Sequence, residues 1–207
     1  MCGRYFLEES PELRPIIEEM NRSPLLPFFQ NTSTVTEFGE VTPTCVVPVI
    51  ASNRSGSRSV FPMKWGFSIP KASGSSTLLI NARVETAAAK PTFRQAWNSH
   101  RCIVPASWYF EWEHFTDASG KKPVGSKYII HPEGTKTAWL CGLYRMEKGL
   151  PSFVILTCEP GESIRFIHDR MPLMLPKEQA EKWIRPETHP EEIAALAQTR
   201  MFYEKAV

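Results

Sequence analysis

The 207-residue chain lacks the features that would direct it into or across a membrane. No run of 18 or more apolar residues occurs, so we expect no transmembrane helix and no membrane partner. The first residues lack a basic stretch followed by an apolar one, so no secretory signal is predicted. These absences favour a cytoplasmic protein.

Cysteine is sparse, and its spacing excludes two common classes of site. The five cysteines are scattered and none forms a C-x-x-C pair, so neither a zinc site nor a disulfide framework is predicted. No phosphate-binding glycine loop occurs either, and we expect no cofactor. The net charge of +2 is too small to indicate nucleic-acid binding by itself. Any such binding must come from a local group of arginines and lysines.

Proline, by contrast, is plentiful and evenly spread, which argues against a helical bundle. Apolar runs predict short strands, and longer helical patterns appear only near the end of the chain, at 177–184 and 191–198. A helix start is expected at Ser10-Pro11-Glu12, and another helix over 84–90 that Pro91 ends. Pro48 and Pro62 should push their strands to edges or bulges. We predict one α+β domain over 1–207, with a mixed or antiparallel, barrel-like β-sheet core and peripheral helices.

The strands are expected at six apolar segments, and a hairpin-like loop is expected at 117–125. The segments are 45–50, 60–67, 102–104, 128–130, 138–144 and 153–157.

One cysteine occupies the second position, in Met1-Cys2-Gly3-Arg4-Tyr5. Methionine aminopeptidase removes Met1 before a small residue, which would leave Cys2 with a free α-amine beside its thiol. The amine titrates near ~7.7–8.0 and the thiol near ~8.5, so both are partly nucleophilic at neutral pH. Such an aminothiol condenses with an aldehyde to an imine, on which the thiol closes a thiazolidine ring. The alternative is a small buried hydrophobic residue.

Two acid–base candidates lie in dense apolar segments. Glu111 lies in the aromatic run Trp108-Tyr109-Phe110-Glu111-Trp112, on a predicted strand. In an apolar wall its pKa would rise and it would carry protons; on a solvated face it would be a surface charge. His168 is either a general acid/base or a structural histidine bonded to a backbone carbonyl. The other histidines, at 100, 114, 131 and 189, are interpreted as surface residues.

Polar and basic residues near strand ends suggest a ligand. Asn81 and Arg83 follow an apolar run, where Asn81 would orient an amine or a phosphate oxygen and Arg83 would bind phosphate. A turn residue and a surface arginine are the alternatives. The segment Lys64-Trp65-Gly66-Phe67 mixes a cation with aromatic rings, as single-stranded nucleic-acid binders do, but core aromatics beside a solvated lysine fit equally.

In this order the segments resemble the SRAP family, the SOS response-associated peptidases or abasic-site processing proteins. The resemblance runs from Cys2 to Pro172 and departs from the family pattern at 41–44 and 71–77. The matching segments are Met1-Cys2-Gly3-Arg4, Trp65-Gly66-Phe67, Asn81-Ala82-Arg83-Val84-Glu85-Thr86 with Lys90-Pro91-Thr92-Phe93-Arg94, Arg101-Cys102-Ile103-Val104-Pro105-Ala106 with Tyr109-Phe110-Glu111-Trp112, and His168-Asp169-Arg170-Met171-Pro172.

The resemblance implies the SRAP fold and a role in the DNA damage response. Family members bind single-stranded DNA at an abasic site and crosslink to it through the N-terminal cysteine, in a lyase-type, self-reversible reaction. We expect a monomer that is nucleoid-associated when bound to damaged DNA. By position, the catalytic residues are Cys2, Asn81, Glu111 and His168. The candidate DNA-binding residues are Arg4, Lys64, Trp65, Phe67, Arg83, Trp112 and Arg170.

Two other functions stay open from the sequence. Cys2, His168 and Glu111 would also suit a thiol peptidase or autopeptidase, as nucleophile, base and orienting acid. The chain would otherwise be a non-enzymatic reader of single-stranded DNA, in which Cys2 is incidental.

Overall fold

A closed five-stranded barrel forms the centre of the fold in a computed structural model that describes residues 2–30, 33–71, 73–114, 120 and 123–206. The order β12-β4-β3-β8-β11 closes because β11 also pairs with β12. The pairing of β12 with β4 is parallel, and the other barrel pairings are antiparallel. The barrel strands are β3 (Val46–Ser52), β4 (Arg58–Trp65), β8 (Arg101–Ala106), β11 (Ala138–Glu147) and β12 (Leu150–Cys158).

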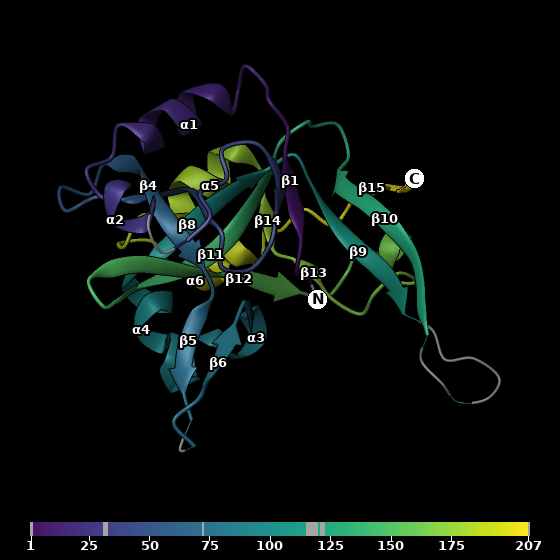
Figure 1. The fold of residues 1–207 in the computed structure, drawn as a ribbon. Coiled ribbons are helices and arrows are strands. Elements are labelled where there is room, and N and C mark those ends of the chain that lie inside the picture. The colour runs from purple at the N-terminus through teal and green to yellow at the C-terminus, as the bar shows by residue number, and fades with distance from the viewer. Residues whose placement is uncertain (1, 31–32, 72, 115–119, 121–122, 207) are drawn as a thin grey trace.

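A second, antiparallel sheet stands beside the barrel (Figure 1). It continues directly from the barrel, because β8 passes into β9 through Ser107. The Ser107 N–H donates to the Phe6 carbonyl at 2.8 Å, which fixes the N-terminal strand against this junction. In sheet order its strands are β15 (Met201–Lys205), β10 (Val124–Pro132), β9 (Trp108–His114), β1 (Tyr5–Leu7) and β2 (Gly39–Val41).

Short strands attach to the barrel and position the site. β7 (Asn81–Arg83) pairs in parallel with β12, β13 (Met171–Pro172) pairs with β12, and β14 (Met174–Leu175) pairs with β11. β5 (Phe67–Pro70) and β6 (Ser76–Leu79) form a separate hairpin that projects from the body (Figure 1). Gly66 begins this hairpin with a φ of 115°, and a Cβ there would lie 2.6 Å from Leu78, so only glycine fits.

The helices lie around the sheets, so the predicted α+β class with a barrel-like core and peripheral helices is confirmed (Figure 1). None of the helices in the described parts of the chain is long and apolar enough to cross a membrane. The helices are α1 (Arg14–Asn21), α2 (Pro27–Gln30), α3 (Val84–Ala87), α4 (Pro91–Ser99), the 3₁₀ turn η1 (Glu162–Ile164), α5 (Lys177–Trp183) and α6 (Pro190–Ala194).

Three helix boundaries differ from the sequence expectations. The first helix begins at Arg14 and not at Ser10, whose carbonyl instead accepts the Arg14 N–H at 3.0 Å in a preceding turn. The helix expected over 84–90 ends at Ala87, and Pro91 instead starts α4, because proline needs no hydrogen-bond partner in a first helical turn. The last helix stops at Ala194, short of the expected 198. The loop expected at 117–125 lies mostly outside the described residues.

The two strand prolines are accommodated inside the barrel. β3 and β4 each have neighbours on both sides, yet Pro48 and Pro62 stand opposite one another in their shared register. The second neighbour of β3 is paired only at Ile50 and Ala51, and that of β4 only at Lys64 and Trp65. At each proline the strand is therefore paired on one side only. The missing N–H removes no hydrogen bond to a second neighbouring strand.

Candidate active site

Cys2 lies just before β1, where strand register brings it to the acidic residue of β9. Tyr5 stands opposite Tyr109, and the Phe110 N–H donates to the Arg4 carbonyl at 2.9 Å. Continuing this antiparallel register places Cys2 opposite Trp112 and beside Glu111. The Cys2 side chain is fully buried, at 0% exposure.

Asn81 joins this cysteine from the other side, at the start of β7. Its Nδ2 donates a hydrogen bond of 2.8 Å to the Cys2 carbonyl, and β7 is held by its parallel pairing with β12. The Asn81 Oδ1 is buried and has no hydrogen-bond partner among the described residues, and the same holds for the Tyr5 hydroxyl. A buried acceptor without a donor costs about 1–3 kcal/mol, so Oδ1 is suited to receive a donor such as an amine.

Glu111 is buried, at 4% exposure, and does not lie on a solvated face. Its Oε1 accepts the Trp112 N–H at 3.3 Å. Burial and, to a smaller extent, the Glu111 charge raise the pKa of the Cys2 thiol from 9.0 to about 12. The thiol is therefore protonated at neutral pH, with a carboxylate close by that can take up a proton.

His168 lies in the loop between η1 and β13, and two groups contact its Nδ1. The Arg170 N–H lies 2.9 Å away and the Asp169 Oδ1 lies 2.8 Å away. Nδ1 accepts from Arg170 when the proton is on Nε2, and it donates to Asp169 when it carries the proton itself. Burial lowers the pKa of His168, although Glu111 partly opposes this. Both neutral tautomers therefore have a partner, which suits a proton-transfer residue.

The structure adds His114, which the sequence had assigned to the surface. Its side chain is exposed, but its ring centroid lies 4.5 Å from that of His168. Ligand atoms of Glu111, His114 and His168 all lie within 4.8 Å of one another. Ideal strand alternation puts residues three apart on opposite faces, so no sequence signal linked His114 to Glu111.

Three of the candidate DNA-binding residues lie near these groups. Arg4 forms an ion pair with Glu40, and its guanidinium lies 5.8 Å from the centre of the Trp112 ring. Trp112 is half-buried. Arg83 ends β7 two residues after Asn81 and is exposed. Arg4 and Trp112 therefore lie against each other beside Cys2, and Arg83 lies on the same face of β7 as Asn81; we refer to these three side chains as the exposed edge.

The other four DNA-binding candidates are occupied elsewhere. Trp65 and Phe67 are fully buried, and the Trp65 Nε1 donates to the Ile80 carbonyl at 3.0 Å, so neither ring offers a face to a base. This contradicts their predicted stacking role, because the Trp65 ring packs against Tyr5 and Phe153 and the Phe67 ring against Phe93 in the core. Lys64, on β4, lines a different hollow that it shares with Arg145.

Arg170 is part of the scaffold that holds the His168 loop. It donates to both Glu85 carboxylate oxygens, at 2.8 and 2.9 Å, and to the Thr157 carbonyl at 2.6 Å. Its side chain is largely buried. These bonds tie the loop to α3 and β12, so both Nη groups of Arg170 are engaged by Glu85 and Thr157 where a phosphate contact was expected.

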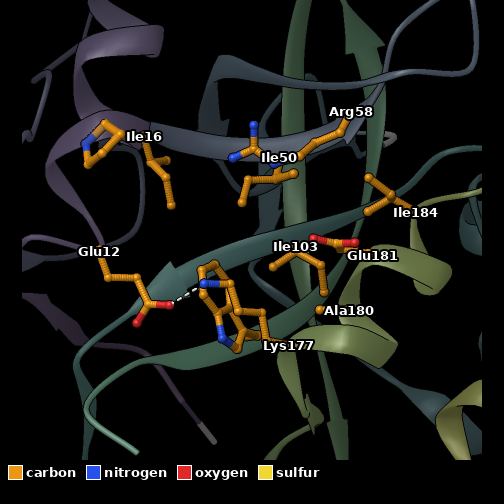
Figure 2. Close-up of a pocket in the computed structure, with 11 residues that line it drawn as sticks. Glu12, Ile16, Ile50, Arg58, Ile103, Lys177, Ala180, Glu181 and Ile184 are labelled. Carbon is orange, nitrogen blue, oxygen red and sulfur yellow. Dashed lines mark hydrogen bonds and ion pairs between the residues drawn. The ribbon is translucent and has the colours of Figure 1, made fainter.

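A cavity of about 170 Å³ lies on a different part of the molecule, between α1, the barrel and α5. Figure 2 shows its isoleucine floor, from Ile16, Ile50 and Ile103, and the contact between Lys177 and Glu12, whose atoms lie 2.6 Å apart. None of the candidate catalytic residues lines it. The cavity is therefore separate from the Cys2 site.

Comparison with known proteins identifies the family of this chain. The family model "SOS response associated peptidase (SRAP)" matches residues 1–205. The chain belongs to the SRAP family. It is 31% identical to "Abasic site processing protein YobE" of Bacillus subtilis, over 95% of this chain and 88% of that protein. It is 30% identical to "Abasic site processing protein YedK" of Escherichia coli, over 95% of this chain and 85% of that one.

A solved structure also shares the fold of this SRAP protein. The crystal structure of a protein from Bacteroides thetaiotaomicron superposes with a TM-score of 0.71, covering 99% of this chain and 91% of that chain. At 24% identity the likeness concerns the fold alone.

Proposed function

We propose that this protein processes abasic sites in single-stranded DNA by forming a thiazolidine crosslink through Cys2. The observation that carries the proposal is the 2.8 Å hydrogen bond from Asn81 to the Cys2 carbonyl, which holds the N-terminal segment beside buried Glu111. Relatives at 30–31% identity bear the name abasic site processing protein. No cofactor is required, because an aminothiol and an aldehyde react directly.

The first chemical step uses the α-amine that removal of Met1 would expose. The amine attacks C1′ of the ring-opened abasic sugar, and loss of water gives an imine. His168 donates a proton to the sugar ring oxygen as the ring opens. Glu111 takes a proton from the attacking amine and passes it to the departing hydroxyl. The Asn81 Oδ1, which has no partner among the described residues, receives an amine N–H.

The second step closes the ring. The Cys2 sulfur forms a bond to C1′ of the imine, and the thiol proton ends on the nitrogen, so the balance is aldehyde plus aminothiol giving thiazolidine plus water. Burial raises the pKa of the Cys2 thiol, which favours the amine over the sulfur as the first nucleophile and so suits this order. The saturated product cannot undergo β-elimination, so the DNA strand is protected from breakage. Glu111 would also assist the reverse reaction.

The DNA is held by the exposed edge near Cys2. Arg83 and Arg4 would contact phosphates, and Trp112 would lie against the lesion. Because few cations take part, binding should fall with salt less steeply than in proteins with many phosphate contacts.

The thiol-peptidase alternative is less well supported. A cysteine peptidase needs a thiolate, which nearby cations stabilise by lowering the thiol pKa. Here burial and the Glu111 carboxylate raise the pKa of Cys2. A thiol-first mechanism is disfavoured, whereas an amine-first mechanism needs no thiolate at the start.

A denaturing gel tests the proposal. Protein shown by mass spectrometry to lack Met1 is mixed with a single-stranded oligonucleotide that carries one abasic site. We expect a denaturant-resistant band that Cys2→Ser abolishes, since serine keeps the amine but cannot close a thiazolidine. Cys158→Ser is the matched control and should crosslink normally. If the Met1-free wild type gives no band, the proposal is wrong.

A further inference from the structure

The cluster of Glu111, His114 and His168 has the composition of a transition-metal site. One carboxylate and two imidazoles come together from β9 and from the loop before β13, with ligand atoms within 4.8 Å of one another. A His₂Glu set with an open fourth position is a known donor set for Zn²⁺. We propose that this protein binds a divalent transition metal of the Zn²⁺ type through Glu111, His114 and His168.

The backbone holds the two histidines close to each other. The His114 N–H donates to the Ile167 carbonyl at 3.0 Å, so the end of β9 is fastened to the residue that precedes His168. The ring centroids are 4.5 Å apart. Tetrahedral zinc, with bonds of about 2.0–2.2 Å, needs its ligand atoms roughly 3.2–3.6 Å apart. Metal binding would therefore draw these ligand atoms together from a spacing of at most 4.8 Å, and the exposed His114 side chain has room to move toward the other two.

The surroundings of His168 also match those of a metal ligand. Its Nδ1 lies 2.8 Å from the Asp169 Oδ1. A metal-bound histidine usually donates its other ring N–H to a carboxylate, which fixes the tautomer and strengthens the ligand. With Nδ1 donating to Asp169, Nε2 is the ring nitrogen that would bind the ion. The Glu111 carboxylate would supply the anionic ligand from a buried position.

The sequence predicted no metal site, because these three ligands do not follow one another at a spacing typical of metal-binding motifs. Its third ligand, His168, lies 54 positions beyond His114 in the chain. It also overlaps the proposed reaction centre. On the proposed function, a bound metal would occupy Glu111 and His168 and so prevent their proton transfers. Metal binding would then inhibit the crosslink, and removal of the metal would restore it.

Metal binding is measured first on the full chain without DNA, by calorimetry with Zn²⁺ and by the visible spectrum with Co²⁺. We expect one ion per chain. His114→Gln should weaken Zn²⁺ binding by more than about tenfold, the lower end of the loss caused by removing even an outer-shell partner. His131→Gln, a histidine of the same sheet that contacts Phe202, is the matched control and should bind normally. Thermal unfolding checks that both variants are folded.

Three results would overturn the metal site. The first is no Zn²⁺ heat and no Co²⁺ spectrum from wild-type protein at a tenfold metal excess. The second is Zn²⁺ binding by His114→Gln as tight as that of wild type. The third is loss of binding in Cys2→Ala that His114→Gln retains, which would assign the ion to the N-terminal aminothiol.

Inhibition is then tested in the crosslinking reaction, by comparing each protein with and without Zn²⁺. We expect Zn²⁺ to slow the wild type and EDTA to restore it, with a much smaller effect on His114→Gln. Equal inhibition of both proteins would contradict the inhibitory role. Because binding is measured without DNA, a failure of the crosslinking function leaves the metal result intact.

Discussion

The Cys2 site and the cavity of Figure 2 differ in whether their polar atoms have hydrogen-bond partners. In the cavity, Glu12 receives hydrogen bonds from both Thr137 and Lys177, at 2.5 and 2.6 Å, above an apolar floor. At the Cys2 site, the Asn81 Oδ1 and the Tyr5 hydroxyl are buried with no hydrogen-bond partner among the described residues.

The difference shows which region is prepared for chemistry. Buried polar atoms are nearly always satisfied in folded proteins, so exceptions call for a reason such as catalysis or binding. In the cavity, both carboxylate oxygens of Glu12 accept hydrogen bonds, which stabilises the fold. At the Cys2 site, the Asn81 and Tyr5 oxygens can still accept hydrogen bonds from a substrate or an amine. Substitutions in the two regions should therefore affect different measurements.

The largest expected effect is that of Glu111→Gln. The amide keeps the size of the side chain and can still accept the Trp112 N–H, but it cannot take up a proton. We expect the crosslinking rate to fall about 10²–10⁴-fold, the usual contribution of a general acid or base. Rates are measured by quenched denaturing gels under single-turnover conditions. Glu113→Gln, on the same strand, is the control; a wild-type rate for Glu111→Gln would refute the proton-transfer role.

Ile103→Ala should have the converse effect. Ile103 is buried in the floor of the cavity, and its truncation should lower the free energy of unfolding by about 2–5 kcal/mol. Denaturant titration measures this loss. The crosslinking rate of the folded fraction should stay at the wild-type value. A large fall in that rate would show that the two regions are coupled and would break the comparison.

Asn81→Leu should reduce crosslinking by roughly 10–100-fold. Leucine has nearly the same size but loses both the donor to the Cys2 carbonyl and the Oδ1 acceptor, which no described residue contacts by a hydrogen bond. Small misplacements of reacting groups are enough to cost about this much. Asn98→Leu, on the exposed side of α4, controls for the loss of an amide. Unchanged single-turnover kinetics in Asn81→Leu would remove Asn81 from the site.

The smallest effect is expected for Glu12→Gln. Partial burial raises the pKa of Glu12, but hydrogen bonds from Lys177 and Thr137 outweigh this and hold the pKa below 4.5. A lowered folded-state pKa stabilises the protein above the unfolded-state value, and this is lost as the pH falls through the folded-state pKa. We expect a loss of at most about 1 kcal/mol at pH 7 that disappears at low pH.

Denaturant titrations from pH 7 to pH 3 check this last prediction. Glu181→Gln, which lines the same cavity, is the control. A loss that grows as the pH falls would contradict the assigned sign.

Local patterns predicted the elements better than the contacts between them. The apolar runs at 102–104 and 153–157 are strands β8 and β12, because a strand covered on both faces needs a continuous apolar sequence. Glu111 was recognised as a charge among aromatics. By contrast, Trp65, Phe67 and Arg170 carried the right residue types for DNA binding but are occupied by core and ion-pair contacts.

By itself, the sequence determined the α+β class, the family resemblance and the residues Cys2, Asn81, Glu111 and His168 as a candidate set. Tertiary structure alone decided that Asn81 holds the Cys2 carbonyl and that His114 joins Glu111 and His168. It also decided which aromatic and cationic side chains remain accessible. The physical reason is that strand register and barrel closure join segments far apart in the chain. Local periodicity carries no information about which strands become neighbours.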